Sequence, residues 1–219
     1  MLKKCLISMI ILLVSSACAF ADKIPSSSKS VKHYGIGLLK INDDFDVYDK
    51  PHADAKIIRH FILPAAKSAI VQDSRKGANP YIVSIPAQRQ FFAAIYEYPE
   101  KNWVQIYYNQ NGKEVGWVKM PEKSDFLTWK EFVYKYGKKN GIVLMKDVPT
   151  SQYKLYAQDN ESAQVVDEFT YPEYIALRMI RGNWALVTVV DTGTVYKTGW
   201  FRWRTDDGKL RVFPKMKQK

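Results

Sequence analysis

The clearest alternation of hydrophobic and polar positions runs over residues 103–117. The larger apolar side chains fall at every second position over residues 104–108, which is the period of a half-buried strand. Asn111-Gly112 supplies a turn that tolerates positive φ, and residues 115–120 open a return strand. The same arrangement comes back over residues 183–200, so the pattern predicts two copies of a small β-module.

Short segments with a similar pattern fill most of the remaining chain, separated by turn-forming residues. Residues 35–41 either begin the first module or form a loosely docked strand. The other predicted strands cover residues 45–48, 57–63, 69–71, 81–85 and 89–98 before the hairpin, and 153–156, 165–169, 174–180, 184–190, 199–203 and 210–213 after the first copy, the last of these as an edge.

The period changes to that of a helix over residues 124–137. Ser124 or Asp125 can cap its start, and Gly137 can end it. The pattern predicts the single helix of the chain, with an apolar stripe packed on a β-module. That stripe consists of Phe126, Trp129, Phe132, Val133 and Tyr136.

Differences in residue number support the repeat. The pairs that differ by 108 are Val47 with Leu155 and Phe61 with Phe169. Trp103 and Trp184 differ by only 81. The first copy therefore carries 108 − 81 = 27 extra residues, and we expect an additional β-hairpin within residues 64–98.

The N-terminus has the features of a secretory signal over residues 1–21. Lys3-Lys4 precedes an apolar run that is too short to span a bilayer, and Ala19-Phe20-Ala21 forms a small-x-small cleavage site. The competing interpretation is a lipoprotein, with Ser16-Ala17-Cys18 as a degenerate lipid-attachment box. We expect a periplasmic or secreted protein without a transmembrane segment in the mature chain.

Composition narrows the classes of function. The 219 residues are 47% hydrophobic, which is enough for real cores, and the net charge of +11 becomes 11 − 2 = +9 once the signal is removed. Both cysteines, Cys5 and Cys18, lie in the signal, so we expect no disulfide or cysteine nucleophile. The basic balance favours an acidic partner in the envelope, and no nucleic-acid motif is present.

No residue pattern predicts catalysis. His52 and His60 are eight residues apart, without a second pair at metal-ligand spacing. The sequence has no Gly-x-Ser-x-Gly elbow and no glycine-rich phosphate loop. Adjacent acids such as Asp43-Asp44 suit a solvated turn better than a general acid–base pair. We therefore expect no enzyme activity, no cofactor and no metal.

The order of short motifs along each of the two copies resembles that of the bacterial SH3-like domain. The matching pieces are Val47-Tyr48, Ile57-Ile58, Asn102-Trp103-Val104 and Val115-Gly116-Trp117-Val118-Lys119, then Leu155-Tyr156, Val165-Val166, Asn183-Trp184-Ala185 and Thr198-Gly199-Trp200-Phe201-Arg202. Asp49-Lys50-Pro51 and Ala157-Gln158-Asp159 depart from the pattern of the family, as does the long insertion. The resemblance implies a non-catalytic role in the envelope, often peptidoglycan or protein binding.

The predicted fold is mainly all-β, with two tandem small SH3-like barrels joined by one α-helix. Its predicted parts are a signal peptide at 1–21, a flexible lead at 22–41, module 1 with a hairpin insert at 42–121, a helical connector at 122–141, module 2 at 142–214 and a basic tail at 215–219.

The last strong strand suggests a ligand surface. Alternation places Phe201 and Trp203 on one face and Trp200, Arg202 and Arg204 on the other. An aromatic floor flanked by arginine suits peptide stems, sugars or anionic polymer, and the alternative is an ordinary half-exposed edge. The candidate ligand residues are Tyr48, Trp117, Tyr156, Trp200, Arg202, Trp203 and Arg204.

Three hypotheses about function remain open. The first is an exported, non-catalytic protein that recognises peptidoglycan or another wall component. The second is an interaction or structural subunit of an envelope complex, and the third is an uncharacterised hydrolase or inhibitor.

Overall fold

A computed structural model describes residues 34–63, 72–73, 82–85, 90–96, 101–109, 114–120, 125–170, 172–191 and 195–216. Residues from Lys32 onward belong to one compact unit. The predicted signal, the alternative lipid site at Cys18 and most of the predicted lead lie outside the described residues. In the described part the chain is mainly β, as predicted, and no helix there is long and apolar enough to cross a membrane.

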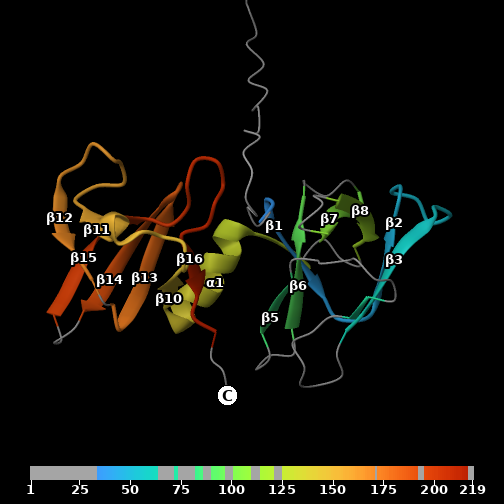
Figure 1. Ribbon diagram of the computed structural model, residues 1–219, viewed down its shortest axis with the longest axis horizontal. Helices are drawn as coiled ribbons and strands as arrows, with labels where there is room; N and C mark the ends of the chain where they lie inside the picture. The colour runs from blue at the N-terminus through green and yellow to red at the C-terminus, as the bar shows by residue number, and fades with distance from the viewer. Residues whose placement is uncertain are drawn as a thin grey trace, which may run out of the picture. The chain divides into compact units, whose positions relative to one another are not determined.

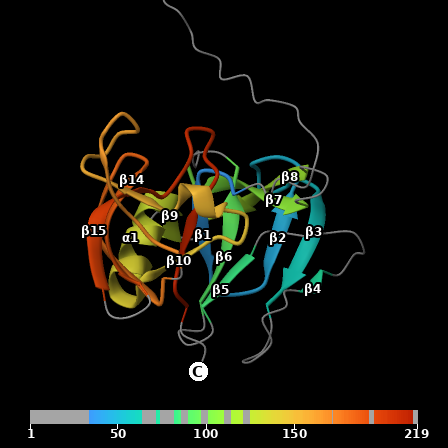
Figure 2. The same cartoon turned by 60° about the vertical axis from the view of Figure 1, so that its left-hand side comes forward.

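The first sheet has nine strands, and every pair is antiparallel (Figures 1 and 2). Their order is β4-β3-β2-β8-β7-β6-β1-β9, with β5 paired to β6. The strands are β1 (Gly37–Ile41), β2 (Phe45–Tyr48), β3 (Ile57–Ile62), β4 (Gln72–Asp73), β5 (Ile82–Ile85), β6 (Gln90–Ile95), β7 (Trp103–Asn109), β8 (Glu114–Lys119) and β9 (Phe126–Thr128). The predicted strands of this half are confirmed, except that the one at 69–71 lies outside the described residues.

The second sheet has seven antiparallel strands in the order β12-β11-β15-β14-β13-β10-β16. They are β10 (Ile142–Leu144), β11 (Lys154–Tyr156), β12 (Val165–Glu168), β13 (Tyr174–Arg181), β14 (Trp184–Asp191), β15 (Val195–Arg202) and β16 (Val212–Pro214), with a 3₁₀ turn at Thr150–Gln152. Figure 1 shows β13, β14 and β15 side by side, and β16 lies at an edge as predicted.

The two sheets repeat one topology. Without β4 and β5 the first order is β3-β2-β8-β7-β6-β1-β9, and each strand has its counterpart at the same place in the second order. We call β1–β9 module 1 and β10–β16 module 2. Neither order returns to its first strand, so in the described residues neither sheet closes into a barrel, and the predicted tandem SH3-like barrels are not confirmed.

Strand β1 belongs to the sheet of module 1, which agrees with the alternative that residues 35–41 begin the first module. The lead was expected to run to residue 41, but β1 pairs with both β6 and β9, and Leu38 and Leu39 are buried because they lie inside the sheet. The insertion was expected to form a hairpin. Strand β5 forms an antiparallel hairpin with β6 inside this stretch, and β4 pairs with β3.

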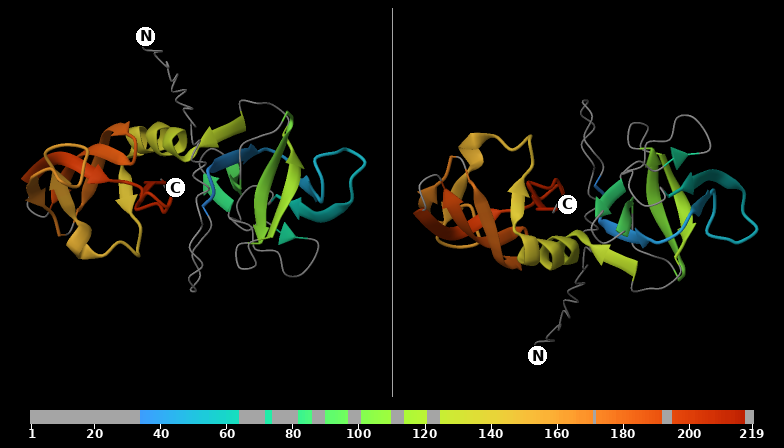
Figure 3. Two further views of the ribbon diagram at one scale, coloured as in Figure 1. Left: turned by 90° about the horizontal axis from the view of Figure 1, so that it is seen from above. Right: turned by 90° about the horizontal axis from the view of Figure 1, so that it is seen from below.

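The helix starts later than its apolar spacing predicted. Phe126 belongs to β9, and α1 covers Trp129–Asn140 (Figure 3). Thr128 caps it in place of Ser124 or Asp125: its Oγ1 accepts the Glu131 N–H at 3.2 Å, and the Glu131 carboxylate accepts the Thr128 N–H at 2.8 Å. This reciprocal capping box satisfies two backbone donors that a strand-to-helix junction would otherwise leave unpaired.

The helix also ends later than predicted. It passes through Gly137 and stops at Gly141, whose φ of 80° lies in the region that favours glycine. Gly137 is needed for packing instead. A Cβ at this position would lie 2.7 Å from Ile142 Cγ2, so only glycine lets α1 approach β10 this closely.

Two hydrophobic cores lie on opposite faces of β1 and β6 in module 1. One is internal to module 1 and includes Leu39, Phe61 and Ile106. The other joins α1 and the interior of module 2 to Leu38 and Phe92 of module 1. The predicted burial of the helical stripe is therefore confirmed for Trp129, Phe132, Val133 and Tyr136. Because neighbouring residues of β1 enter different cores, α1 stabilises the sheet of module 1 as well as connecting the modules.

Candidate functional site

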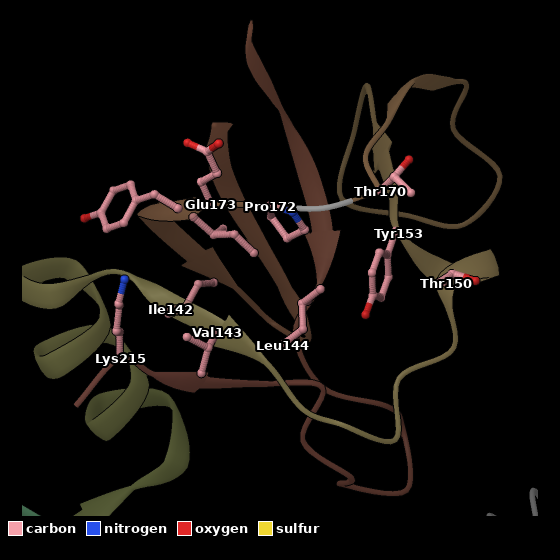
Figure 4. A pocket seen from close by; sticks show the side chains of 11 residues that line it. Ile142, Val143, Leu144, Thr150, Tyr153, Thr170, Pro172, Glu173 and Lys215 are labelled. Carbon is pink, nitrogen blue, oxygen red and sulfur yellow. The ribbon is translucent and has the colours of Figure 1, made fainter. Parts of the chain in front are cut away.

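Module 2 has an apolar groove where its sheet opens. Strands β10 and β13 pair only at Ile142 and Ile175, whereas their counterparts β1 and β6 pair over the whole length of β1. The groove has a volume of about 460 Å³, and Figure 4 shows Val143 and Leu144 of β10 on one side of it. Its remaining lining residues are Thr150, Tyr153, Thr170, Pro172, Glu173, Tyr174 and Lys215.

A second cavity, which we call the polar pocket, has a volume of about 210 Å³. It lies at the end of module 2 where β11, β14 and β15 come together. Its lining residues are Ser151, Gln152, Lys154, Tyr156, Glu161, Trp184, Arg202 and Arg211. Two predicted ligand residues, Tyr156 and Arg202, therefore meet here.

The strand register explains how these side chains converge. Tyr156 lies opposite Trp200, and Arg202 lies opposite Trp184, so alternate residues of β15 place Trp200 and Arg202 on one face. The Tyr156 and Trp184 rings meet edge to face at 5.3 Å and 80°. The Arg202 guanidinium carbon lies 6.0 Å from the Trp184 ring centre, within cation–π range.

Arg202 is held by two acids. Its Nη1 pairs with the Glu161 carboxylate, and its Nη2 lies 2.5 Å from Asp206 Oδ2. Hydrogen bonds from Arg202 and Asn183 hold the pKa of Asp206 below its ordinary value. Both acids are largely exposed, so they clamp the outer end of a side chain that is itself mostly buried.

Arg211 enters the same pocket from the segment before β16. Its backbone N–H donates to the Trp203 carbonyl at 2.8 Å, which fixes the segment beside the end of β15. Burial, and next the positive charge of Arg202, lower the pKa of Arg211, while Tyr156, Asp206 and Asp207 act in the opposite direction. The pocket thus holds two guanidinium groups close enough to repel each other.

The other predicted ligand residues of module 2 lie outside this pocket. Trp203 was predicted to contact ligand, but it is wholly buried in the core, and its Nε1 donates to the Gly182 carbonyl at 3.0 Å. Phe201 shares that buried face, as the alternation predicted. Arg204 covers the Trp203 ring and donates to Asn183 Oδ1 at 3.1 Å, and Arg181 covers the Trp200 ring at 5.2 Å.

Tyr48 and Trp117, the predicted ligand residues of module 1, lie opposite each other on β2 and β8. Tyr48 meets the Trp103 ring edge to face, as Tyr156 meets Trp184 in module 2. Neither residue lines the groove or the polar pocket, so the structure does not bring the predicted residues of the two modules into one site.

Sequence reasoning missed Arg211, Lys154 and Trp184 as pocket residues. A signal for Arg211 was present, because Leu210 and Val212 alternate as apolar positions and so place Arg211 on the opposite face. The convergence of β11 on β15 involves residues far apart in the chain and had no local signal.

The two described histidines, His52 and His60, each lie beside one aspartate. His60 Nδ1 lies 2.7 Å from Asp46 Oδ1, and His52 lies 3.6 Å from Asp54 on the surface. Across the described part of the chain, no group of three or more His, Cys, Asp or Glu side chains could hold a metal ion.

Comparisons with known proteins add no identification. A scan against protein-family models, a search of curated proteins and a search of solved structures each found no match for this chain. The resemblance to bacterial SH3-like domains therefore rests on the residues and the repeated order alone.

Proposed function

We propose that this protein is an exported, non-catalytic binding protein of the cell envelope. It recognises peptidoglycan or another wall component through its SH3-like modules, in the periplasm or outside the cell. The observation that carries this proposal is the polar pocket of module 2, where Tyr156, Trp184, Arg202 and Arg211 present aromatic rings and cationic N–H donors together.

The chemistry of the pocket suits the polymers of a bacterial wall. Aromatic rings offer flat apolar surfaces to sugar rings, and guanidinium groups bind the carboxylates of peptide stems. The expected charge of +9 on the mature chain would concentrate it near an anionic polymer.

Retention on purified, salt-washed peptidoglycan tests the proposal. The chain without residues 1–21 should co-sediment with the polymer at physiological ionic strength, well above a control protein of equal size and net charge. Retention no better than that of the control would contradict wall binding, because charge alone would then account for the interaction.

A second candidate function is that of an interaction subunit in an envelope complex. The apolar groove between β10 and β13 favours it, since such a groove suits the aliphatic side chains of a protein partner better than a sugar. Cross-linking in cells separates the two functions: one discrete partner band supports the subunit, and retention on the wall without such a band supports the first proposal.

A further inference from the structure

We propose that the polar pocket of module 2 binds a single oxyanion, a carboxylate or phosphate group, between Arg211 and Arg202. This inference specifies the ligand chemistry of the function proposed above and rests on it. It also assigns the binding to one module only.

Arg211 supplies the main binding charge. Among the described residues, its side chain makes no hydrogen bond, and no carboxylate lies within the ion-pair distance of 4.0 Å. Burial takes the guanidinium partly out of water, and Arg202 repels it, so its charged form is disfavoured where it lies. An anion bound beside it would offset both effects.

Arg202 supplies a further donor. Its two Nη atoms are engaged by Glu161 and Asp206, but its Nε is buried and has no hydrogen-bond partner in the structure as described. A buried N–H without an acceptor is destabilising, because the group has lost its hydrogen bond to water. Because this Nε has no exposed surface, an oxyanion oxygen would accept its hydrogen bond only after the Arg202 side chain shifts, and Arg211 is the donor that meets the anion first.

The charge balance favours a monoanion over a dianion. Three cations and three carboxylates surround the pocket, since Lys154 pairs with Glu168 at 3.3 Å and Arg202 pairs with two acids, so the pocket is neutral overall. A bound anion therefore depends on the N–H donors of Arg211 and not on a net positive charge. The volume of about 210 Å³ equals roughly seven waters at about 30 Å³ each. The pocket therefore has room for the anionic group and the first atoms of the chain that carries it.

Module 1 has the same framework without the second cation. Lys119 occupies the position of Arg202, because Lys119 pairs with Trp103 as Arg202 pairs with Trp184. Asp125 occupies the position of Arg211, because each immediately precedes the last strand of its module. A lysine and an aspartate can neutralise each other, so we infer no oxyanion site in module 1.

The test is a titration of the ¹⁵N-labelled chain, residues 22–219, with sodium acetate and with inorganic phosphate against sodium chloride of equal ionic strength. The Arg202 Nε–H and the backbone amides of Tyr156 and Arg211 should shift saturably with acetate, and less strongly with phosphate. Arg211→Gln should weaken binding at least about tenfold, because a hydrogen-bonded charged group is lost. Lys119→Gln, the matched change in module 1, should alter it less than about twofold.

Equal binding by Arg211→Gln and the unchanged chain would overturn the inference, as would shifts that chloride reproduces. Arg211→Lys keeps the positive charge but not the planar guanidinium, so its affinity for acetate should lie between those of the unchanged chain and Arg211→Gln. An intermediate affinity would show that the loss in Arg211→Gln does not come from misfolding. Peptidoglycan retention separates the proposals. If Arg211→Gln no longer binds acetate but is still fully retained on peptidoglycan, the oxyanion site is not the site that binds the wall, and only this inference fails. If acetate binds but the unchanged chain is not retained, the proposed function fails.

Discussion

The two modules share details of side-chain packing as well as the order of their strands. Tyr48 meets Trp103 at 5.3 Å and 87°, and Tyr156 meets Trp184 at 5.3 Å and 80°. Each Tyr follows a register shift in its strand, between Val47 and Tyr48 in one module and at the matching place in the other. The extra residue of the bulge, Ile58 or Val166, lies on the neighbouring strand, so the same local irregularity stands beside the same aromatic pair in both modules.

The modules differ in the charges carried on this framework. The cross-strand pair Asp46–His60 in module 1 corresponds to Lys154–Glu168 in module 2, with the acid moved to the other strand. Lys119 and Asp125 likewise correspond to Arg202 and Arg211. The comparison teaches that similar apolar residues give the same fold in both modules while the charges differ, and our proposal places the anion site in module 2 alone because of that difference.

The modules also protect the same sheet edge by different means. In module 1, β4 covers β3. In module 2, Lys197 donates to the Glu168 carbonyl and pairs with Asp167 at 3.1 Å, and Asp191 accepts the Thr170 N–H at 3.3 Å. Polar side chains near an edge discourage pairing with another chain, so the shorter module needs no additional strand.

The largest expected effect concerns the core that the modules share. Trp129 is fully buried, packs on Phe132 and Phe213, and donates from Nε1 to the Tyr34 carbonyl at 2.6 Å. Trp129→Ala should lower the free energy of unfolding by about 3–5 kcal/mol in chemical denaturation. Tyr134→Ala, at an exposed position of α1, is the control. A loss below about 1 kcal/mol for Trp129→Ala would show that the modules do not depend on this core.

Two equivalent glycines give the next largest effect. A Cβ on Gly116 would lie 2.3 Å from Val47 Cγ1, and one on Gly199 would lie 2.8 Å from Leu155 Cβ. Gly116→Ala and Gly199→Ala should each lower the free energy of unfolding by about 1–3 kcal/mol, because a methyl group overpacks the same place in each module. Tyr196→Ala, on β15 but exposed, should have little effect. If only one of the two substitutions lowered the free energy of unfolding, the two glycines would not be equivalent in packing.

The exchanged charge pair should have a smaller effect. Glu168→Lys places like charges opposite each other on β11 and β12 and should lower the free energy of unfolding by up to about 1 kcal/mol, because both side chains are partly exposed. The double change Lys154→Glu with Glu168→Lys should restore it. If the free energy of unfolding did not recover in the double variant, the acid could not be exchanged between the two strands.

The smallest effect is the pH dependence of Asp206. Its pKa is lower in the folded protein than in an unfolded chain, so its ion pair stabilises the fold above a pH of about 4 and this contribution is lost as pH falls through the lowered value. The melting temperature of Asp206→Asn should therefore lie slightly below that of the unchanged chain at pH 6, and the gap should close near pH 2. A gap that widens on acidification would contradict this.

The sequence predicted the mainly β fold, most strands, the single helix and the repeat, because alternation and helical spacing are local signals. It misplaced the helix start, since Phe126 fits the helical spacing but lies in β9. It left open whether residues 35–41 begin the module or form a loosely docked strand, because a short apolar segment does not reveal that it pairs with β6 and β9. The closed barrels were expected from the resemblance to SH3-like domains, because the residue pattern itself does not predict whether a sheet closes.

The candidate site was predicted in part, because alternation along a strand is a local signal while contacts between distant strands are not. The alternation along β15 separated Trp200 and Arg202 from Phe201 correctly, but Trp203 lies in the core because its face of the strand turns inward. Arg211 joins Arg202 only through the pairing that holds the end of β15 beside the segment before β16. Such a meeting of distant residues depends on tertiary structure and leaves little trace in local pattern.

The most direct test of the central claim is a map of backbone amide shifts on adding soluble, carboxylate-bearing wall fragments to the ¹⁵N-labelled chain. The account predicts saturable shifts at Tyr156, Trp184 and Arg211, with their module 1 counterparts Tyr48, Trp103 and Asp125 unchanged. Equal shifts in both modules, or shifts confined to module 1, would contradict the claim that charge alone distinguishes the binding module from its twin.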